Sequence, residues 1–262
     1  MLSLDLTGKT ALIGGSTQGI GLASAKELAA LGANCVLISR NEEKLKAAVT
    51  TLPADKGQQH SYLVADYAQP GQVKEVVSKF VQNNTVQILV NNSGGPAGGP
   101  VAKAQPEEFV SAFSQHLLCN HIITTLVMDG MKQAGYGRII NIISTSVKIP
   151  LKDLGVSNTI RGAVASWAKT MANELGQYGI TVNNVLPGAT ATERLDTILT
   201  NKVNKTGKSR EEAEQEMVAE IPARRFGQPE EIAAMIAFLT TPAAAYVNGT
   251  SIPVDGGRTG SM

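Results

Sequence analysis

A glycine-rich segment near the start of the chain has the spacing of a phosphate-binding turn. It reads Gly14-Gly-Ser-Thr-Gln-Gly-Ile-Gly21, follows an apolar run and precedes a helical pattern that continues to Leu31. Such glycines permit a tight turn and close approach of the backbone to a pyrophosphate, and the helix N-terminus supplies N–H donors. A plain strand-to-helix turn is the alternative interpretation. The predicted dinucleotide contacts are Gly15, Ser16, Thr17, Gln18, Gly19, Ile20 and Gly21.

The next β-rich run ends in Ile38-Ser39-Arg40, without the carboxylate that would bind the hydroxyls of an adenosine ribose. A carboxylate there would repel a 2′-phosphate, whereas the guanidinium fork of Arg40 can bind one. The sequence therefore favours NADP(H) over NAD(H). The alternative is a solvated Arg40 paired with Glu42 or Glu43.

The elements that must position these residues follow a βαβ rhythm, in which short β-rich runs alternate with helical patterns. The runs are mostly apolar without strict alternation, as expected when helices cover both faces of a parallel sheet. We predict an α/β fold, a doubly wound parallel sheet in one domain that spans residues 1–262. The predicted strands are 10–13, 34–39, 60–65, 86–91, 138–143 and 181–186.

The segment 193–221 differs from the rest of the chain because it is rich in Lys, Glu, Asn and Thr. It lies between a strand end and the helical pattern that begins near Pro229. Ligands of open α/β sheets bind outside the carboxyl ends of the strands. We therefore predict that 193–221 is a lid over the substrate.

Composition excludes several classes of partner. The formal net charge is +1, with 43% hydrophobic and 17% charged residues, so neither nucleic acid nor an anionic membrane is an expected partner. The N-terminal residues form no leader pattern, and no window approaches the about 18 apolar residues of a membrane span. Cys35 and Cys119 make no disulfide framework, which fits a reducing compartment. A cytoplasmic protein with a small-molecule partner is predicted.

Six motifs together are similar to those of the short-chain dehydrogenase/reductase family, most nearly its bacterial three-oxoacyl-carrier-protein-reductase-like branch. The resemblance implies a Rossmann-type domain with a seven-stranded sheet, assembly as a homotetramer and no metal. It also implies hydride transfer between NAD(P)H and a carbonyl or alcohol. The motifs are Gly15-x-x-x-Gly19-Ile-Gly21, Asp66, Asn91-Asn-Ser-Gly94, Gly137-Arg-Ile-Ile-Asn-Ile-Ile-Ser144, Thr181-Val-Asn-Asn-Val-Leu-Pro-Gly188 and Asn248-Gly-Thr-Ser-Ile-Pro-Val-Asp-Gly-Gly257.

The resemblance assigns further cofactor contacts by position. Asp66 matches the residue that meets the adenine amino group, and Asn92 lies under the adenosine ribose. Thr190 and Thr192 follow the turn that cradles the nicotinamide amide. Helix capping is the alternative for Asp66 and for Thr192. At the start of the glycine-rich turn, Gly14 stands where the family usually has Thr.

The family's catalytic pattern is altered in this chain. The family's spacing places its tyrosine thirteen positions after the active serine, Ser144, and its lysine four positions further, but the chain has Ser157 and Arg161 there. The family's helix Asn falls on His116, with Asn120 one turn further. Serine is a much weaker acid than tyrosine, and an arginine with a pKa above about 12 cannot readily pass on a proton.

Two functions remain open at this point. In the first, Ser144 orients the carbonyl, Arg161 holds the nicotinamide ribose, and Ser157 or His116 serves a water-mediated relay. A positioned general acid contributes roughly 10² to 10⁴ in rate, so its loss weakens reduction without abolishing it. In the second, the chain binds the dinucleotide with weak or no turnover, as a redox sensor or an oligomer subunit. The alternative is that both residues have only structural roles, His116 as a packed or capping helix residue and Ser157 as a helix cap.

Overall fold

Seven parallel strands form one sheet in the order β3-β2-β1-β4-β5-β6-β7 in the computed structural model, which describes residues 2–260. One half of the sheet grows outward from β1 and the other from β4, which confirms the predicted doubly wound architecture. The strands are β1 Thr10–Gly14, β2 Asn34–Ser39, β3 Ser61–Val64, β4 Ile88–Asn91, β5 Gly137–Ile142, β6 Ile180–Pro187 and β7 Ser251–Val254.

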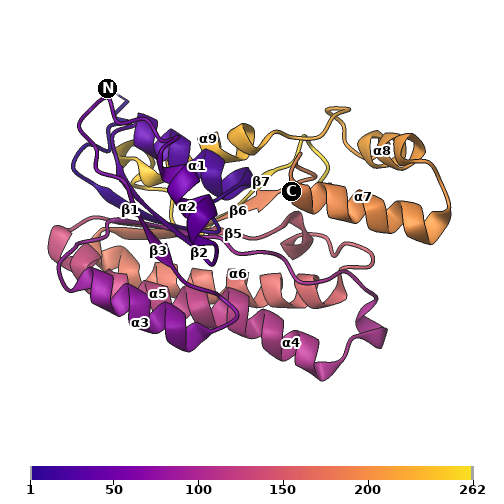
Figure 1. Ribbon diagram of the computed structural model, residues 1–262, viewed down its shortest axis with the longest axis horizontal. Coiled ribbons are helices and arrows are strands. Elements are labelled where there is room, and N and C mark those ends of the chain that lie inside the picture. The colour runs from indigo at the N-terminus through magenta and orange to yellow at the C-terminus, as the bar shows by residue number, and fades with distance from the viewer. Residues whose placement is uncertain (1, 261–262) are drawn as a thin grey trace.

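Helices cover both faces of the sheet (Figure 1). Helices α1, α2 and α9 pack on one face, and α3, α5 and α6 pack on the other. Helices α7 and α8 lie together at the far end of the molecule, beyond β6 (Figure 1). No helix within residues 2–260 is both long and apolar enough to cross a membrane. The helices are α1 Gly19–Ala30, α2 Glu42–Val49, α3 Pro70–Val81, α4 Pro106–Phe113, α5 Cys119–Ala134, α6 Gly155–Leu175, α7 Glu193–Thr206, α8 Arg210–Ala219 and α9 Pro229–Thr240.

Consecutive strand residues are buried on opposite faces of the sheet. In β1, Leu12 packs in the core formed with α3, α5 and α6, whereas Ile13 packs in the core formed with α1, α2 and α9. In β5, Ile139 and Ile140 are divided in the same way. Because both faces are covered, each strand position requires an apolar side chain, which explains the continuous apolar runs in the sequence.

A buried chain of amides crosses the sheet near its carboxyl edge. Asn91 Nδ2 donates to Asn141 Oδ1 at 2.9 Å, and Asn141 Nδ2 donates to Asn184 Oδ1 at 3.0 Å. Asn184 Nδ2 in turn donates to Ser251 Oγ at 3.0 Å. These four residues are also the paired positions of β4, β5, β6 and β7, so the amide chain fixes the register of the strands that carry the candidate site.

Candidate functional site

The glycine-rich turn joins β1 to α1 and requires its glycines. Gly15 and Gly19 have φ of +53° and +54°, in the left-handed region that other residues rarely adopt. A Cβ at Gly21 would lie 2.8 Å from Asn92 Nδ2 and would also overlap the carbonyl of Gly15. The turn therefore brings backbone, rather than side chains, to the surface at the start of α1.

The N-terminus of α1 has the features of an anion site. Its N-cap residue, Gln18, makes no side-chain capping bond, so the N–H groups of the first turn remain available to a phosphate. Ser16 is fully buried and its Oγ donates to the carbonyl of Ile38 at 3.5 Å. A phosphate contact by Ser16 would consequently come from its backbone.

Asn92 and Tyr67 hold the turn from beneath. Asn92 Nδ2 donates to the carbonyls of Gly14 and Gly15, each at 3.2 Å. A Cβ at Gly14 would lie 2.5 Å from both Tyr67 Oη and Asn92 O. Tyr67 thus fills the space that the family's usual Thr would need, which explains Gly14 at this position.

Arg40 is exposed directly after β2 and makes no ion pair with any residue from 2 to 260. The alternative partners Glu42 and Glu43 pair instead with Lys46, at 3.5 and 3.0 Å. Because Ser39 is paired with Val64 of β3, the segment after β3 runs beside Arg40. The guanidinium is therefore free to receive a phosphate at this edge of the sheet.

Asp66 does not cap a helix, because the N-cap of α3 is Gln69. Its Oδ1 accepts a hydrogen bond from the Ala68 backbone at 2.9 Å. The carboxylate is partly exposed and retains lone pairs for a ligand. The geometry leaves the predicted contact to an adenine amino group open.

Thr190 and Thr192 lead from β6 into α7. Thr190 is buried and its Oγ1 donates to the Gly188 carbonyl at 3.1 Å, while Thr192 Oγ1 donates to the Thr190 carbonyl at 3.2 Å. Thr192 is the N-cap residue of α7 but makes no side-chain capping bond. Its methyl carbon would lie 3.3 Å from a Cβ at Gly19, so this segment lies against the glycine-rich turn.

Ser144 follows β5 in extended backbone, and its Oγ accepts a hydrogen bond from the Ser146 N–H at 3.1 Å. This bond occupies an acceptor lone pair and leaves the hydroxyl hydrogen available to a substrate oxygen. Ser157 lies within the first turn of α6, whose N-cap is Leu154, so Ser157 is not the helix cap. Its partly buried hydroxyl makes no hydrogen bond within residues 2–260.

Arg161 lies one turn after Ser157 on α6 and is partly buried. Its Nη1 donates to the carbonyl of Ile142, at the end of β5, at 3.0 Å. Burial, together with the charge of Arg194, lowers the pKa of the Arg161 guanidinium to about 10. Arg161 is therefore a cation at neutral pH, next to the strand end that leads to Ser144.

His116 belongs to a π-helical segment, Ser114–Leu118, between α4 and α5. The ring is 2% exposed, and its Nδ1 lies 2.7 Å from Ser93 Oγ. Burial, with smaller contributions from Arg161 and Arg194, lowers the pKa of His116 to about 3. The imidazole is consequently neutral at pH 7. It can pass a proton from one ring nitrogen to the other, but it does not carry an extra proton in the resting protein.

Arg194 is the site residue that the sequence analysis missed. It is the second residue of α7, is partly buried, and its Nη2 donates to the Pro96 carbonyl at 2.8 Å. A Cβ at Gly95 would lie 3.5 Å from its Nε. No motif spacing indicates this role, and the only sequence signal was its place in the segment 193–221.

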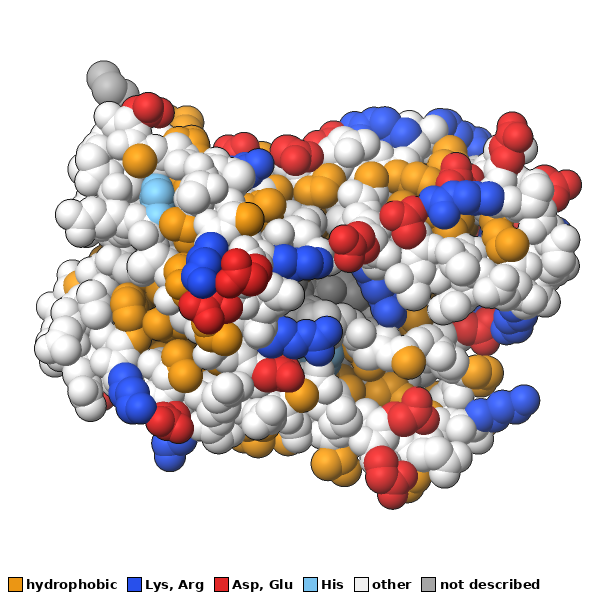
Figure 2. Space-filling model, in the orientation of Figure 1, with side chains coloured by type: hydrophobic (Ala, Val, Ile, Leu, Met, Phe, Trp, Pro, Cys, Tyr) orange, Lys and Arg blue, Asp and Glu red, His pale blue; other side chains and the backbone are white. Residues whose placement is uncertain are grey.

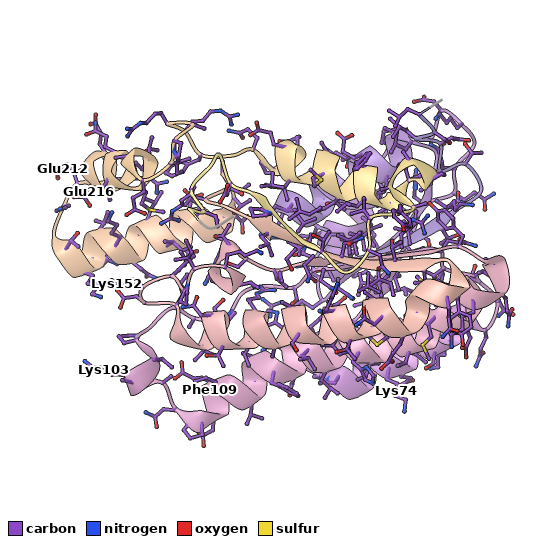
Figure 3. All side chains as sticks on the ribbon, turned by 180° about the vertical axis from the view of Figure 1, so that it is seen from behind. Lys74, Lys103, Phe109, Lys152, Glu212 and Glu216 are labelled. Atoms are coloured by element: carbon purple, nitrogen blue, oxygen red, sulfur yellow. The ribbon has the colours of Figure 1, made fainter. Side chains whose placement is uncertain are left out.

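The segment 193–221 forms α7 and α8 and is attached at both ends of α7. Gln18 Nε2 donates to Glu193 Oε2 at 2.7 Å, and Lys205 Nζ lies 2.7 Å from Asp153 Oδ2. Lys152 is exposed on the loop that faces α7 (Figure 3). Figure 2 shows both basic and acidic side chains around the middle of this face.

The predicted site residues therefore gather at the carboxyl edge of the sheet in two groups. The glycine-rich turn, Arg40 and Asp66 lie after β1, β2 and β3, whereas the serines, Arg161 and His116 lie after or beside β4 and β5. In the described part of the chain, no group of three His, Cys, Asp or Glu side chains is placed to hold a metal ion. The first group suits a dinucleotide and the second a polar substrate.

Known proteins with similar sequences and structures are reductases and dehydrogenases by name. Residues 15–259 match the family model described as enoyl-(acyl carrier protein) reductase. The chain is 32% identical to D-β-hydroxybutyrate dehydrogenase of Cupriavidus necator, over 96% of this chain and 98% of that protein. It is also 32% identical to the 3-oxoacyl-(acyl-carrier-protein) reductase of Rickettsia felis, over 97% and 98%. The crystal structure of L-sorbose reductase from Gluconobacter frateurii, complexed with NADPH and L-sorbose, superposes with a TM-score of 0.92 at 29% identity, over 99% of this chain and 100% of that one.

Proposed function

Because the chain belongs to the short-chain dehydrogenase/reductase family, we propose that it is an NADP(H)-dependent oxidoreductase acting on a carbonyl or alcohol substrate. The intact dinucleotide cradle carries the proposal: left-handed glycines, an uncapped α1 N-terminus and an Arg40 without an acidic partner. The NADPH in the similar L-sorbose reductase supports this cofactor. When bound, NADPH supplies the hydride for carbonyl reduction.

The protein's own residues would then orient the substrate and deliver a proton. The Ser144 hydroxyl, with its hydrogen free, donates to the carbonyl oxygen and stabilises the charge that develops there. Arg161 adds a fixed positive charge and donors for the nicotinamide ribose. The proton reaches the oxygen through water held by Ser157, with neutral His116 as a further member of the relay. This arrangement is the atypical part of the proposal.

The proposal has three further parts: a lid formed by the segment 193–221, assembly as a homotetramer and a cytoplasmic location. The attachments of Glu193 to the glycine-rich turn and of Lys205 to Asp153 support a lid role for 193–221, because both tie α7 across the edge of the sheet. Homotetrameric assembly and a cytoplasmic location stay predictions from family resemblance and composition.

A dinucleotide-binding protein with weak or no turnover is the second candidate function. It is favoured by one observation: Ser157 is a much weaker acid than the tyrosine that the family uses, and His116 carries no proton to give at neutral pH. A sensor or an oligomer subunit would keep the cradle without a proton donor.

Two measurements in sequence test these functions. Fluorescence titration with NADPH and NADH gives both affinities, and we expect NADPH to bind more tightly. Single-turnover mixing with a panel of ketones and oxo acids then follows NADPH oxidation. Binding followed by slow hydride transfer supports the enzyme. Binding without transfer to any compound supports the second function, and absence of nucleotide binding overturns both.

Arg40→Asp tests the cofactor preference directly. The change removes the guanidinium fork and adds a charge that repels the 2′-phosphate, so we expect NADPH to bind about 10- to 100-fold more weakly while NADH binding is retained. The matched control is Lys74→Asp, an equal charge reversal at an exposed position of α3. An unchanged ratio of the two dissociation constants in Arg40→Asp would remove Arg40 from the cofactor site.

A further inference from the structure

Two arginines from different layers of the molecule meet at the substrate side of the site. Arg161 comes from α6 under the sheet edge, and Arg194 comes from α7 in the segment above it. Arg194 contacts the loop at Gly95 and Pro96, which directly follows Ser93, the hydrogen-bond partner of His116. Arg161 contacts the carbonyl of Ile142 at the end of β5, the strand beside β4. The lowered pKa of His116, to which both arginines contribute, agrees with this placement. The two cations therefore share one partly buried region with His116 and Ser93.

Neither guanidinium has an acidic partner. Each makes one side-chain hydrogen bond, to a backbone carbonyl: Arg161 Nη1 to Ile142 O at 3.0 Å, and Arg194 Nη2 to Pro96 O at 2.8 Å. Among residues 2–260 no carboxylate forms an ion pair with either. A guanidinium carries five N–H donors, so both arginines retain donors for a ligand.

The other basic side chains of the segment 193–221 are different. Lys202 and Lys208 pair with Glu216, Lys205 pairs with Asp153, and Arg210 pairs with Asp196 and Glu214. Glu216, which pairs with two of these lysines, lies on α8 near Glu212 (Figure 3). These cations are paired with carboxylates, whereas Arg194, whose side chain is directed to the loop at Gly95 and Pro96, is not. Two partly desolvated like charges without counterions are unfavourable unless an anion joins them.

The cofactor's phosphates are not the anion that this arrangement fits. Glu193 and Arg194 are consecutive on α7, so their side chains point about 100° apart around the helix. Glu193 is directed to Gln18 of the glycine-rich turn, and Arg194 is directed to the loop at Gly95 and Pro96. Arg194 therefore faces the substrate side, away from the phosphate-binding turn.

We propose that Arg194 and Arg161 together bind a carboxylate group of the substrate, so that the protein reduces oxo acids or oxidises hydroxy acids. A carboxylate matches the planar donor fork of arginine, and its negative charge would offset one of the two positive charges. The proposal rests on the proposed oxidoreductase function, in which Ser144 takes the carbonyl of the same molecule. The balanced reaction is oxo acid plus NADPH plus H⁺ giving hydroxy acid plus NADP⁺, with hydride added to carbon and the proton to oxygen.

Matched acids and esters test the proposal. Pyruvate, acetoacetate and levulinate, each beside its methyl ester, are given to the NADPH complex in steady-state assays. Each is also titrated calorimetrically into the NADP⁺ complex. The ester keeps the carbonyl and removes the charge, so we expect at least one acid to exceed its ester about 10- to 100-fold in kcat/KM or in affinity.

Arg194→Met should remove most of that preference while the dissociation constant of NADPH stays within about twofold, and Arg194→Lys should retain part of it. Arg210→Met is the control, because it removes a neutralised positive charge from the same segment. Equal behaviour of acids and esters, absence of acid binding, or an unchanged preference in Arg194→Met would overturn the proposal. Acid-selective binding that depends on Arg194 without hydride transfer to any compound would support the carboxylate site and overturn the enzymatic function instead.

Discussion

At the scale of single residues, the candidate site presents Ser157 and Arg161 at the two helix positions where the family has a tyrosine and a lysine. Ser157 and Arg161 lie one turn apart on α6, in the geometry that a tyrosine and a lysine would share. The hydroxyl of Ser157 is free of protein partners in the described chain, and Arg161 is held by the Ile142 carbonyl. In the proposed mechanism, this pair therefore differs from the family's pair in acidity, because the helix that presents the two side chains is in place.

Restoring the family's pair should restore proton delivery. In Ser157→Tyr with Arg161→Lys, the phenol reaches further and is acidified by the neighbouring ammonium, so we expect single-turnover reduction of a simple, uncharged ketone to be at least about tenfold faster. The upper bound is the roughly 10² to 10⁴ that general acids contribute. Ser157→Ala is the control and should be no faster than the natural protein. An unchanged rate in the double variant would show that the native site uses another donor.

Burial of His116 predicts a pH dependence of stability. The pKa of this imidazole is about 3 in the folded protein and about 6.5 in an unfolded chain, so the unfolded state takes up the proton first as the pH falls. Stability is complete above about pH 6.5 and decreases toward pH 3, with a slope of up to about 1.4 kcal/mol per pH unit. His116→Asn removes this titration and keeps a polar partner for Ser93. Urea denaturation between about pH 7 and pH 4 should therefore give a shallower pH dependence for the variant, and parallel curves would contradict the assignment.

At the scale of elements, α7 connects the two halves of the site. Its first residues contact the glycine-rich turn and the loop at Pro96, and its last turn pairs with Asp153 of the loop before α6. Helix α7 thus contacts the predicted cofactor site, the loop on the substrate side and the loop that precedes Ser157. A movement of α7 would change all three together, as expected of a lid.

Asp153→Asn tests whether the ion pair with Lys205 holds this helix down. Asp153 has φ +59°, a conformation that Asn also tolerates, so the backbone should be unaffected. The pair is exposed, and we expect amide hydrogen exchange across 193–221 to accelerate by at most about fivefold, with KM raised and the melting temperature unchanged. Glu75→Gln breaks an equally short pair with Lys79 on α3 and should alter neither exchange in the segment nor KM. Identical exchange rates of the segment 193–221 in Asp153→Asn and Glu75→Gln would show that the Asp153–Lys205 pair does not hold α7 in place.

At the scale of the whole molecule, the sequence predicted the architecture because its signals are local. The apolar runs of β1 and β5 reflect burial on both faces, and the glycines at 15 and 19 reflect left-handed turns that few other residues adopt. Arg194 has no such signal: its role depends on how far α7 folds back over the loop at Gly95, which is a tertiary contact. Nor did spacing show that His116 is buried among cations and neutral, since this follows from packing of three separate segments.

The hydrogen-bonded amides across β4, β5 and β6 link the stability of the whole fold to the candidate site, because the same strands carry both. Asn141 is fully buried, donates to Asn184 and accepts from Asn91, and it lies three residues before Ser144. Asn141→Leu would leave a donor on Asn91 and an acceptor on Asn184 without partners, at a cost of roughly 1–3 kcal/mol each. We expect the melting temperature to fall by about 5–20 °C in calorimetry. Asn91→Leu combined with Asn141→Leu removes both ends of one bond, so its cost should be smaller than the sum of the single changes. Strict additivity would mean that the amides do not act as one chain and that the register at Ser144 is held by the backbone ladder alone.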